Sequence, residues 1–303
     1  MANIIALIWD CDCTLIDGYM QDPLFRKFNV DSIAFWEEVR ALPEHYKKDQ
    51  GVTVNPETIY LSHFIHKARD GVFPGLNNAM LRELGTEQKF YPGVPEIFES
   101  TVKMIAEEKR YAEYGIKVEH YVISTGFAET IRGSLLMQYI TGLWGCELIE
   151  APDAQGNPLI SEIGYTIDNT TKTRALFEIN KGIRFTEGAD VNAQIPEEQR
   201  RVHFKNMIYI ADGPSDIPAF SLINKNGGST FAIYPKGNFR AMQQVERMRE
   251  DGRINMYAEA DYRDGTLADF WIRNKVQMLA ERIYQTEKQK QRNAFSSVPR
   301  HLT

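Results

Sequence analysis

Four aspartates follow runs of apolar residues, and their spacing is suited to binding a divalent cation. Asp10 and Asp12 end the segment IIALIWDCD. Asp212 and Asp216 lie four residues apart in ADGPSD, which also follows an apolar run. Carboxylates brought together raise one another's pKa unless a cation neutralises them. Because all these ligands are oxygens, with no histidine or cysteine required, the pattern favours Mg²⁺ over a transition metal.

A soft-metal site is the alternative suggested by the cysteines, Cys11, Cys13 and Cys146. Cys11 and Cys13 could form half of such a site, but no second cysteine pair or nearby histidine completes it. An odd, small number of cysteines indicates reduced thiols. We therefore expect no zinc site and a cytoplasmic location.

The pattern of strands and helices predicts how these side chains are positioned. Short runs rich in Ile, Val and Tyr alternate with helical patterns, which is typical of an α/β protein with a Rossmann-like parallel sheet. In open parallel sheets, ligands bind beyond the carboxyl ends of the strands. The aspartates lie at such ends, as do Ser124, Thr125 and Gly126 in YVISTG. The predicted strands are near residues 4–9, 117–125, 205–213, 229–235 and 254–262.

The remaining segments predict an inserted helical domain. Residues 19–89 have helical apolar spacing and no convincing strand, so we expect a separate lobe there. One of its helices is expected to start with Asn55 as the cap and Pro56 as the first helical residue. The core would comprise residues 1–18 and 90–290, with a hairpin at 146–167, a surface insertion at 184–204 and a flexible tail at 291–303. An apolar stripe near 272–283 indicates a last helix that packs on the core or, less favoured, forms a dimer contact.

Composition argues against two classes of partner. The 303-residue chain carries a net charge of −6 with acidic and basic residues mixed along its length, and nucleic-acid binding usually requires a basic face. No apolar run approaches the length of a membrane span. We expect a monomer or homodimer that acts on a small molecule, without nucleic-acid or membrane partners.

Two of these motifs together resemble a known superfamily. Asp10-x-Asp12-x-Thr14 after an apolar strand resembles the first motif of the haloacid dehalogenase superfamily. ADGPSDIPAF, with Asp212 and Asp216, resembles its fourth motif. The helical insert and the hairpin look most like the phosphoserine-phosphatase branch. The resemblance implies an α/β core with an inserted helical cap domain.

The other two motifs of the superfamily also have counterparts. Ser124-Thr125-Gly126 resembles the second motif, and Lys172 stands where the third motif has its lysine, with Lys181 as the weaker alternative. The sequence departs from the usual pattern at Cys11 and Cys13, which replace apolar or small residues but keep the spacing.

The resemblance implies a Mg²⁺-dependent hydrolase of a small-molecule phosphomonoester. Asp10 would attack phosphorus and form an aspartyl-phosphate, and Asp12 would act as general acid and then as general base. Mg²⁺ would bind the Asp10 carboxylate, the Asp12 backbone carbonyl and Asp212, with Asp216 as a direct or water-bridged ligand.

The remaining motif residues would bind phosphate or support the loop. The Ser124-Thr125-Gly126 segment and Lys172 would hold the phosphate oxygens, and Thr14 would brace the loop by hydrogen bonding.

Three other functions remain open at this point. A phosphotransferase or mutase would pass the phosphoryl group to a second hydroxyl, and a catalytically silent regulatory protein would only bind phosphate. A dehalogenase is disfavoured, because dehalogenases of the superfamily lack the aspartate found here at position 12. Basic residues of the cap could contact the leaving group, although solvated surface is the favoured role for each: Arg26, Lys27, His45, Lys47 and Lys48.

Overall fold

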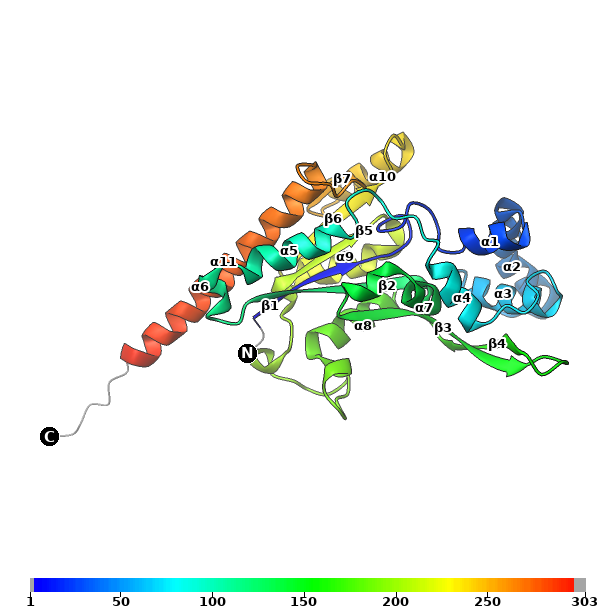
Figure 1. Cartoon of the computed structure of the whole chain (residues 1–303), viewed down its shortest axis with the longest axis horizontal. Coiled ribbons are helices and arrows are strands. Elements are labelled where there is room, and N and C mark those ends of the chain that lie inside the picture. Colours follow the sequence, from blue (N-terminus) through cyan, green and yellow to red (C-terminus); the bar gives the residue numbers. More distant parts are fainter. Residues whose placement is uncertain (1–2, 297–303) are drawn as a thin grey trace.

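The computed structural model of this chain describes residues 3–296 and contains a seven-stranded, mostly parallel sheet. The strand order is β4-β3-β2-β1-β5-β6-β7, so β1 lies in the middle (Figure 1). The predicted α/β, Rossmann-like class is confirmed. The strands are β1 (Ile4–Trp9), β2 (Lys117–Phe127), β3 (Gly142–Pro152), β4 (Pro158–Tyr165), β5 (Met207–Ala211), β6 (Ser229–Tyr234) and β7 (Met256–Glu259).

Strand β1 is buried along its whole length, as its continuous apolar sequence requires. It pairs in parallel with β2 on one side and β5 on the other. Trp9 is in register with Val122 of β2 and with Ile210 of β5. The residues that follow Trp9, Val122 and Ile210 therefore emerge at the same edge of the sheet.

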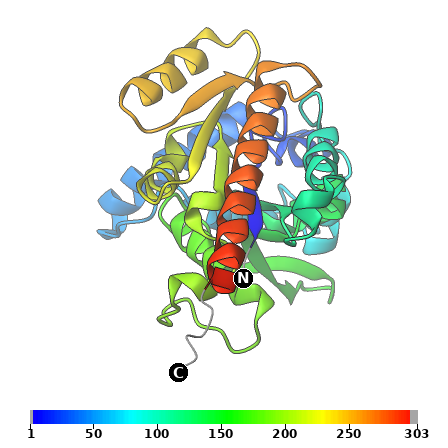
Figure 2. The same ribbon diagram turned by 90° about the vertical axis from the view of Figure 1, so that its left-hand side faces the viewer.

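Helices cover both faces of the sheet. Helices α5 and α11 pack against each other on one face, and α8 and α9 pack together on the other (Figure 2). The helices are α1 (Asp22–Phe28), α2 (Ser32–Gln50), α3 (Ile59–Arg69), α4 (Asn78–Gly85), α5 (Glu96–Ala106), α6 (Lys109–Ala112), α7 (Ala128–Gly133), α8 (Thr171–Lys181), α9 (Ile217–Lys225), α10 (Phe239–Glu250) and α11 (Leu267–Ser296).

Connections on the two sides of β1 run in opposite directions across the sheet, which leaves a crevice at the carboxyl end of β1. The connection from β1 leads to β2 on one side, whereas the later connection through α8 leads to β5 on the other side. Parallel crossovers are right-handed, so connections that run in opposite directions place their helices on opposite faces. Ligands of such sheets bind at this point of divergence.

Strand β3 extends further than the predicted hairpin. Residues 146–167 were expected to form only a hairpin, but β3 begins at Gly142 and its first half pairs in parallel with β2. Only its second half pairs antiparallel with β4. The prediction missed this first half because Gly142 and Gly145 resemble turn residues; a Cβ at Gly145 would lie 3.0 Å from Ala128 Cα, so the close approach of α7 requires glycine there.

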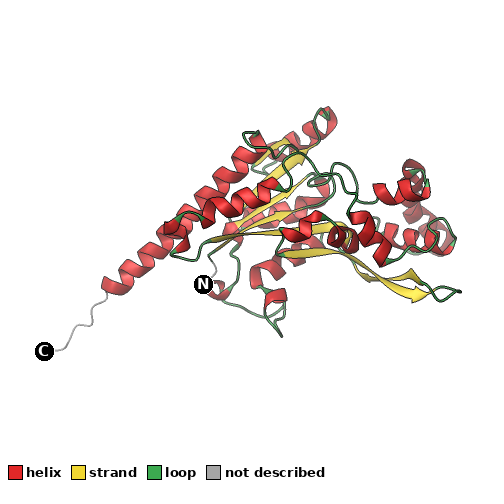
Figure 3. Cartoon of the chain, viewed as in Figure 1, coloured by secondary structure: helices red, strands yellow, loops and turns green. Residues whose placement is uncertain are grey.

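Helices α1–α4 lie between β1 and β2 in sequence and beyond the carboxyl ends of the core strands in space (Figures 1 and 3). Helix α2 is capped at its start by Asp31, whose carboxylate accepts from the Ile33 and Ala34 amides, and at its end by Gly51 in the left-handed conformation. Helix α3 begins at Ile59 and not at the Asn55-Pro56 start that the sequence indicates. Asn55 Oδ1 instead accepts from the Glu57 amide in a turn.

The predicted apolar stripe of the last helix packs on the core. Ile272, Val276, Leu279 and Ile283 of α11 are all buried within the monomer. Helix α11 continues to Ser296, into the segment expected to be a tail; the rest of that segment lies outside the described residues. Within residues 3–296, no helix combines the length and apolar content that crossing a bilayer requires.

Candidate active site

The loop after β1 is a tight turn built on the carbonyl of Cys11. The Asp10 amide donates to Ile210 O at 2.9 Å, which extends the pairing with β5 by one residue. The Cys11 carbonyl then accepts from the amides of Leu15 at 2.9 Å and Ile16 at 3.0 Å. Cys13 has a φ of 54°, so the chain reverses direction there. Asp10 and Asp12 are thereby held at the edge of the sheet.

Lys172 is the lysine that the structure brings to this loop. Its Nζ donates to Asp10 Oδ1 at 3.0 Å and to Asp216 Oδ1 at 2.7 Å, and its side chain is 1% exposed. Burial lowers the pKa of Lys172, but Asp10 and Asp216 outweigh it and raise the pKa above its ordinary value. Lys181, the alternative, donates to the carbonyls of Val191 and Ala193 in the following loop.

Asp216 is fully buried and well supplied with hydrogen bonds. Besides Lys172, it accepts from Tyr209 Oη at 2.6 Å and from Ser215 Oγ at 3.0 Å. A buried carboxylate is tolerated only when it is paired in this way. With both oxygens engaged, Asp216 serves first to position Lys172.

Asp212 has no such compensation. Oxygens of Asp10, Asp212 and Asp216 all lie within 4.8 Å of one another. Burial, and then the charges of Asp10 and Asp216, raise the pKa of Asp212 well above its ordinary range. Among residues 3–296, Asp212 has no hydrogen bond or ion pair through its side chain. An uncompensated carboxylate beside two others fits a site for a hard divalent cation.

Asp10 and Asp12 have different proton affinities. Burial raises the pKa of Asp10 and Lys172 opposes this rise, so that the pKa is about 6. Burial and the charge of Asp10 raise the pKa of Asp12 to about 8, although Asp12 Oδ1 accepts from the Met20 amide at 3.0 Å. At neutral pH without a cation, Asp10 is mainly ionised and Asp12 mainly protonated. Two neighbouring carboxyls separated in this way can act as a base or nucleophile and as an acid.

The predicted residues at the end of β2 lie at the same edge of the sheet. Ser124 is buried and its Oγ accepts from the Gly126 amide at 3.0 Å, which leaves its hydroxyl proton free to donate elsewhere. Thr125 O accepts from Tyr60 Oη of α3. A Cβ on Gly126 would lie 2.2 Å from Met20 Cε, so the Met20 side chain, which follows the loop after β1, packs directly against this glycine.

Thr14 supports the loop by hydrogen bonding through its backbone. Its hydroxyl is fully buried and has no hydrogen-bond partner in the described part of the chain. The loop is instead tied by the Thr14 carbonyl, which accepts from Tyr262 Oη at 2.7 Å. Tyr262 lies just after β7, and the sequence pattern could not predict a contact between residues so far apart in the chain.

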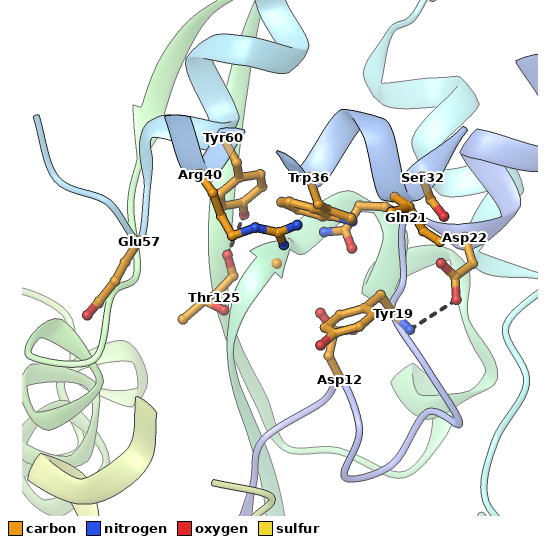
Figure 4. A pocket seen from close by; sticks show the side chains of 12 residues that line it. Asp12, Tyr19, Gln21, Asp22, Ser32, Trp36, Arg40, Glu57, Tyr60 and Thr125 are labelled. Atoms are coloured by element: carbon orange, nitrogen blue, oxygen red, sulfur yellow. Dashed lines mark hydrogen bonds between the residues drawn. The ribbon is translucent and has the colours of Figure 1, made fainter. Parts of the chain in front are cut away.

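A cavity of about 480 Å³ opens above Asp12, between the sheet edge and helices α2 and α3 (Figure 4). Thr125 and Gly126 form its wall on the sheet side, and Trp36 and Arg40 of α2 form its wall on the helical side. It is the size of pockets that hold small-molecule ligands.

The residues of this cavity that sequence reasoning missed come from the helical segment. None of the five basic residues suggested for the leaving group lines it. Arg26 pairs with Glu87 at 3.8 Å and His45 with Asp49 at 3.2 Å. Arg40 lies on α2. The apolar spacing of this helix could have indicated which of its residues are buried, but not which of its polar residues face the sheet.

The cysteines form no metal site in the described residues. All three are free thiols, and the group of potential ligands contains only aspartates.

One comparison shows the family of this chain. An uncharacterised protein of Borreliella burgdorferi is 37% identical over 287 residues, which cover 90% of this chain and 97% of that protein. The chain belongs to the family of this protein. No protein-family model matches the chain.

Solved structures show the wider fold. A HAD family hydrolase from Salmonella enterica serovar Typhi superimposes with a TM-score of 0.50 at 15% identity, covering 85% of this chain and 67% of that one. A phosphoserine phosphatase in its apo form gives a TM-score of 0.50 at 12% identity, covering 86% and 96%. The chain has the haloacid dehalogenase fold, and the resemblance stated from its motifs is confirmed at that level.

Proposed function

We propose that this protein is a Mg²⁺-dependent phosphatase that hydrolyses a small-molecule phosphomonoester through a phosphorylated Asp10. The convergence of Lys172 and the aspartate cluster at one edge of the sheet, next to a cavity that Asp12 lines, carries this proposal. The HAD-like fold and the aspartate cluster support a phosphatase-like hydrolase.

The first half of the reaction uses the two carboxyls in different roles. An oxygen of Asp10 attacks phosphorus, and the bond between phosphorus and the ester oxygen breaks. The proton of Asp12 passes to that oxygen, so that the product leaves as a neutral alcohol. Lys172 Nζ, which contacts Asp10, and the Ser124 hydroxyl would donate to the phosphate oxygens.

The second half returns the enzyme to its initial state. Asp12, now ionised, accepts a proton from a water molecule that attacks the same phosphorus atom. The bond between phosphorus and Asp10 breaks, and inorganic phosphate leaves. Asp12 ends the cycle protonated, as its raised pKa favours.

The residues present fit a magnesium ion. The carboxylates of Asp10 and Asp212 and the carbonyl of Asp12 would hold it, with Asp216 bound directly or through water. When bound, Mg²⁺ neutralises these carboxylates and stabilises negative charge on the phosphoryl oxygens.

Helices α1–α4 would serve as the cap domain of such an enzyme, and the remaining elements as its core. Residues of α2 and α3 lie across the cavity from Asp12 and would shield the reaction from bulk water. Three free cysteines are consistent with a reducing, cytoplasmic location, and the size of the cavity is consistent with a small-molecule substrate.

The test is phosphate release from a panel of phosphomonoesters by the full chain, with Mg²⁺ or with EDTA. We expect release that requires Mg²⁺ and that falls by about 10³-fold or more in Asp10→Asn. Asp70→Asn, which changes an exposed aspartate outside the site, is the matched control. Absence of release from every ester, or equal activity in Asp10→Asn and Asp70→Asn, would contradict the proposal.

A further inference from the structure

The cavity above Asp12 would receive the leaving group of the substrate. This step rests on the proposed function, because Asp12 would protonate the leaving oxygen. At about 480 Å³, the cavity lies within the range of roughly 300–1,000 Å³ that holds drug-sized ligands. An alcohol of only a few carbon atoms would leave most of it unfilled. The cavity is therefore suited to a larger leaving group.

One face of α2 turns an aromatic ring towards this space. Ser32, Trp36 and Arg40 are spaced by four residues, so they share a helix face, and all three line the cavity. The Trp36 ring packs against Tyr60, with centroids 5.8 Å apart, and against Phe25 at 6.2 Å. These contacts hold the indole in place. It is only partly buried, and its remaining surface adjoins the cavity (Figure 4).

Two groups beside the ring can form further hydrogen bonds. Gln21 is 3% exposed and lines the cavity, yet its Oε1 is buried with no hydrogen-bond partner in residues 3–296. Figure 4 shows its amide next to Trp36. Buried amide groups almost always have a partner, so an unpartnered one in a cavity indicates a ligand group that completes it.

Arg40 supplies the second group. Its guanidinium lies beside Trp36 and makes no ion pair or side-chain hydrogen bond within the part of the chain that the structure describes (Figure 4). A guanidinium can both stack on a planar ring and donate to a ring carbonyl. An unpaired guanidinium would also attract an anionic ester towards the cavity.

We propose that the leaving group carries a planar ring with hydrogen-bonding atoms. The ring stacks on Trp36, and its polar edge bonds the Gln21 amide and the Arg40 guanidinium. A nucleoside has this chemistry, and so does a substituted pyridine alcohol. Trp36 and Gln21 are then specificity-determining residues of the phosphatase.

The test compares ring-bearing and ringless esters with the full chain and Mg²⁺. The ring-bearing esters are uridine and adenosine monophosphates and pyridoxal phosphate, which distinguish the two sources of ring. The ringless esters are glycerol phosphate and phosphoserine. We expect kcat/KM to be about ten-fold or more higher for at least one ring-bearing ester than for either ringless one.

Variants assign the preference to the two residues. Trp36→Leu should reduce the ratio of ring-bearing to ringless kcat/KM by about ten-fold, and Trp36→Phe should retain it. Gln21→Leu should raise KM for the ring-bearing ester by about ten-fold without lowering the melting temperature, because it removes a buried unpartnered oxygen. Tyr46→Leu, elsewhere on α2, should change nothing.

Binding measurements separate this inference from the proposed function. Calorimetric titration with uridine and with pyridoxine should detect binding of one of them that weakens in Trp36→Leu. Such binding without hydrolysis of any ester would contradict the phosphatase and support the ligand class. Efficient hydrolysis of ringless esters, with a ratio unchanged in Trp36→Leu, would overturn the ligand class and leave the phosphatase intact.

Discussion

At the scale of single residues, the site depends on how the charge of four aspartates is balanced. Lys172 lies between Asp10 and Asp216 and compensates the two most buried of them. Asp12 and Asp212 lack a cationic partner at hydrogen-bond distance, and the pKa of each is raised, mainly by burial. A divalent cation next to Asp212 and a proton on Asp12 would neutralise the remaining negative charge. The proposed phosphoryl transfer starts from this protonation state.

Lys172 and Lys181 can be distinguished by mutation. Lys172→Ala should lower kcat by about 10²- to 10³-fold, because it removes the ammonium that contacts Asp10 and would contact phosphate. Lys181→Ala should leave kcat unchanged, because Lys181 contacts only backbone carbonyls of the loop that follows α8. Steady-state kinetics on one ester suffice. Loss of activity in Lys181→Ala with normal activity in Lys172→Ala would reverse the assignment.

Stability should depend on pH through Asp12. Its pKa rises from about 4 in the unfolded chain to about 8 in the folded protein, so the folded state binds the proton more tightly. The metal-free protein should therefore lose stability as pH rises from about 4 to about 8. Melting temperatures in EDTA should be lower at pH 8 than at pH 6.

The control for this prediction is Asp12→Asn, which cannot titrate. Its melting temperature should fall less between pH 6 and pH 8 than that of the unaltered protein. An identical fall in both proteins would show that Asp12 is not the group responsible.

The sequence predicted which residues gather at the sheet edge better than it predicted which residues line the cavity. Asp10 and Asp212 directly follow apolar strands, and Ser124 lies near the carboxyl end of a third; parallel strands place these ends together. Gln21 and Trp36 could not be found in this way. Gln21 precedes α1 and Trp36 lies on α2, and their positions at the cavity depend on how these helices pack against the sheet, which long-range contacts decide.

At the scale of elements, local patterns predicted the central strands and failed where glycines or turns dominate. β1, β2 and β5 have apolar runs that only a buried strand explains. The first half of β3 contains Gly142 and Gly145. These glycines allow close contacts with other elements, which the local sequence pattern does not show. The start of α3 was misplaced because Asn55 can cap a helix or close a turn, and here it closes a turn.

Helices α4 and α7 meet at two glycines, and this contact should be sensitive to substitution. A Cβ on Gly133 would lie 1.7 Å from Arg82 O, and one on Gly85 would lie 2.1 Å from Thr130 O. Gly133→Ala should lower the free energy of unfolding by about 2–3 kcal/mol, because backbone atoms must separate. Urea denaturation measures this change.

Gly164→Ala in β4 is the matched control. There the nearest atom to the new Cβ would be Ile149 Cγ1 at 3.2 Å, a side-chain atom that can move. Equal stability of the two variants would contradict the close α4–α7 contact.

At the scale of the whole molecule, the helical segment is tied to the core on the side of the cavity. Tyr60 of α3 donates to Thr125 O, and Asn78 of α4 donates to Leu148 O of β3 at 2.9 Å. The Ile160 amide of β4 donates to Leu76 O at 2.9 Å. The β3–β4 hairpin thus supports the helices that face Asp12. In the proposed enzyme, specificity and chemistry would be provided by separate parts of the fold.

The central claim is that Asp10 becomes phosphorylated during turnover, and trapping the enzyme tests it most directly. The full chain with Mg²⁺ and a cleaved ester is quenched in acid during steady-state turnover, and its peptides are analysed by mass spectrometry. We predict a phosphoryl group on Asp10, absent in Asp10→Asn and absent without ester. Normal phosphate release with no phosphoryl group on Asp10, or continued turnover by Asp10→Asn, would contradict the account.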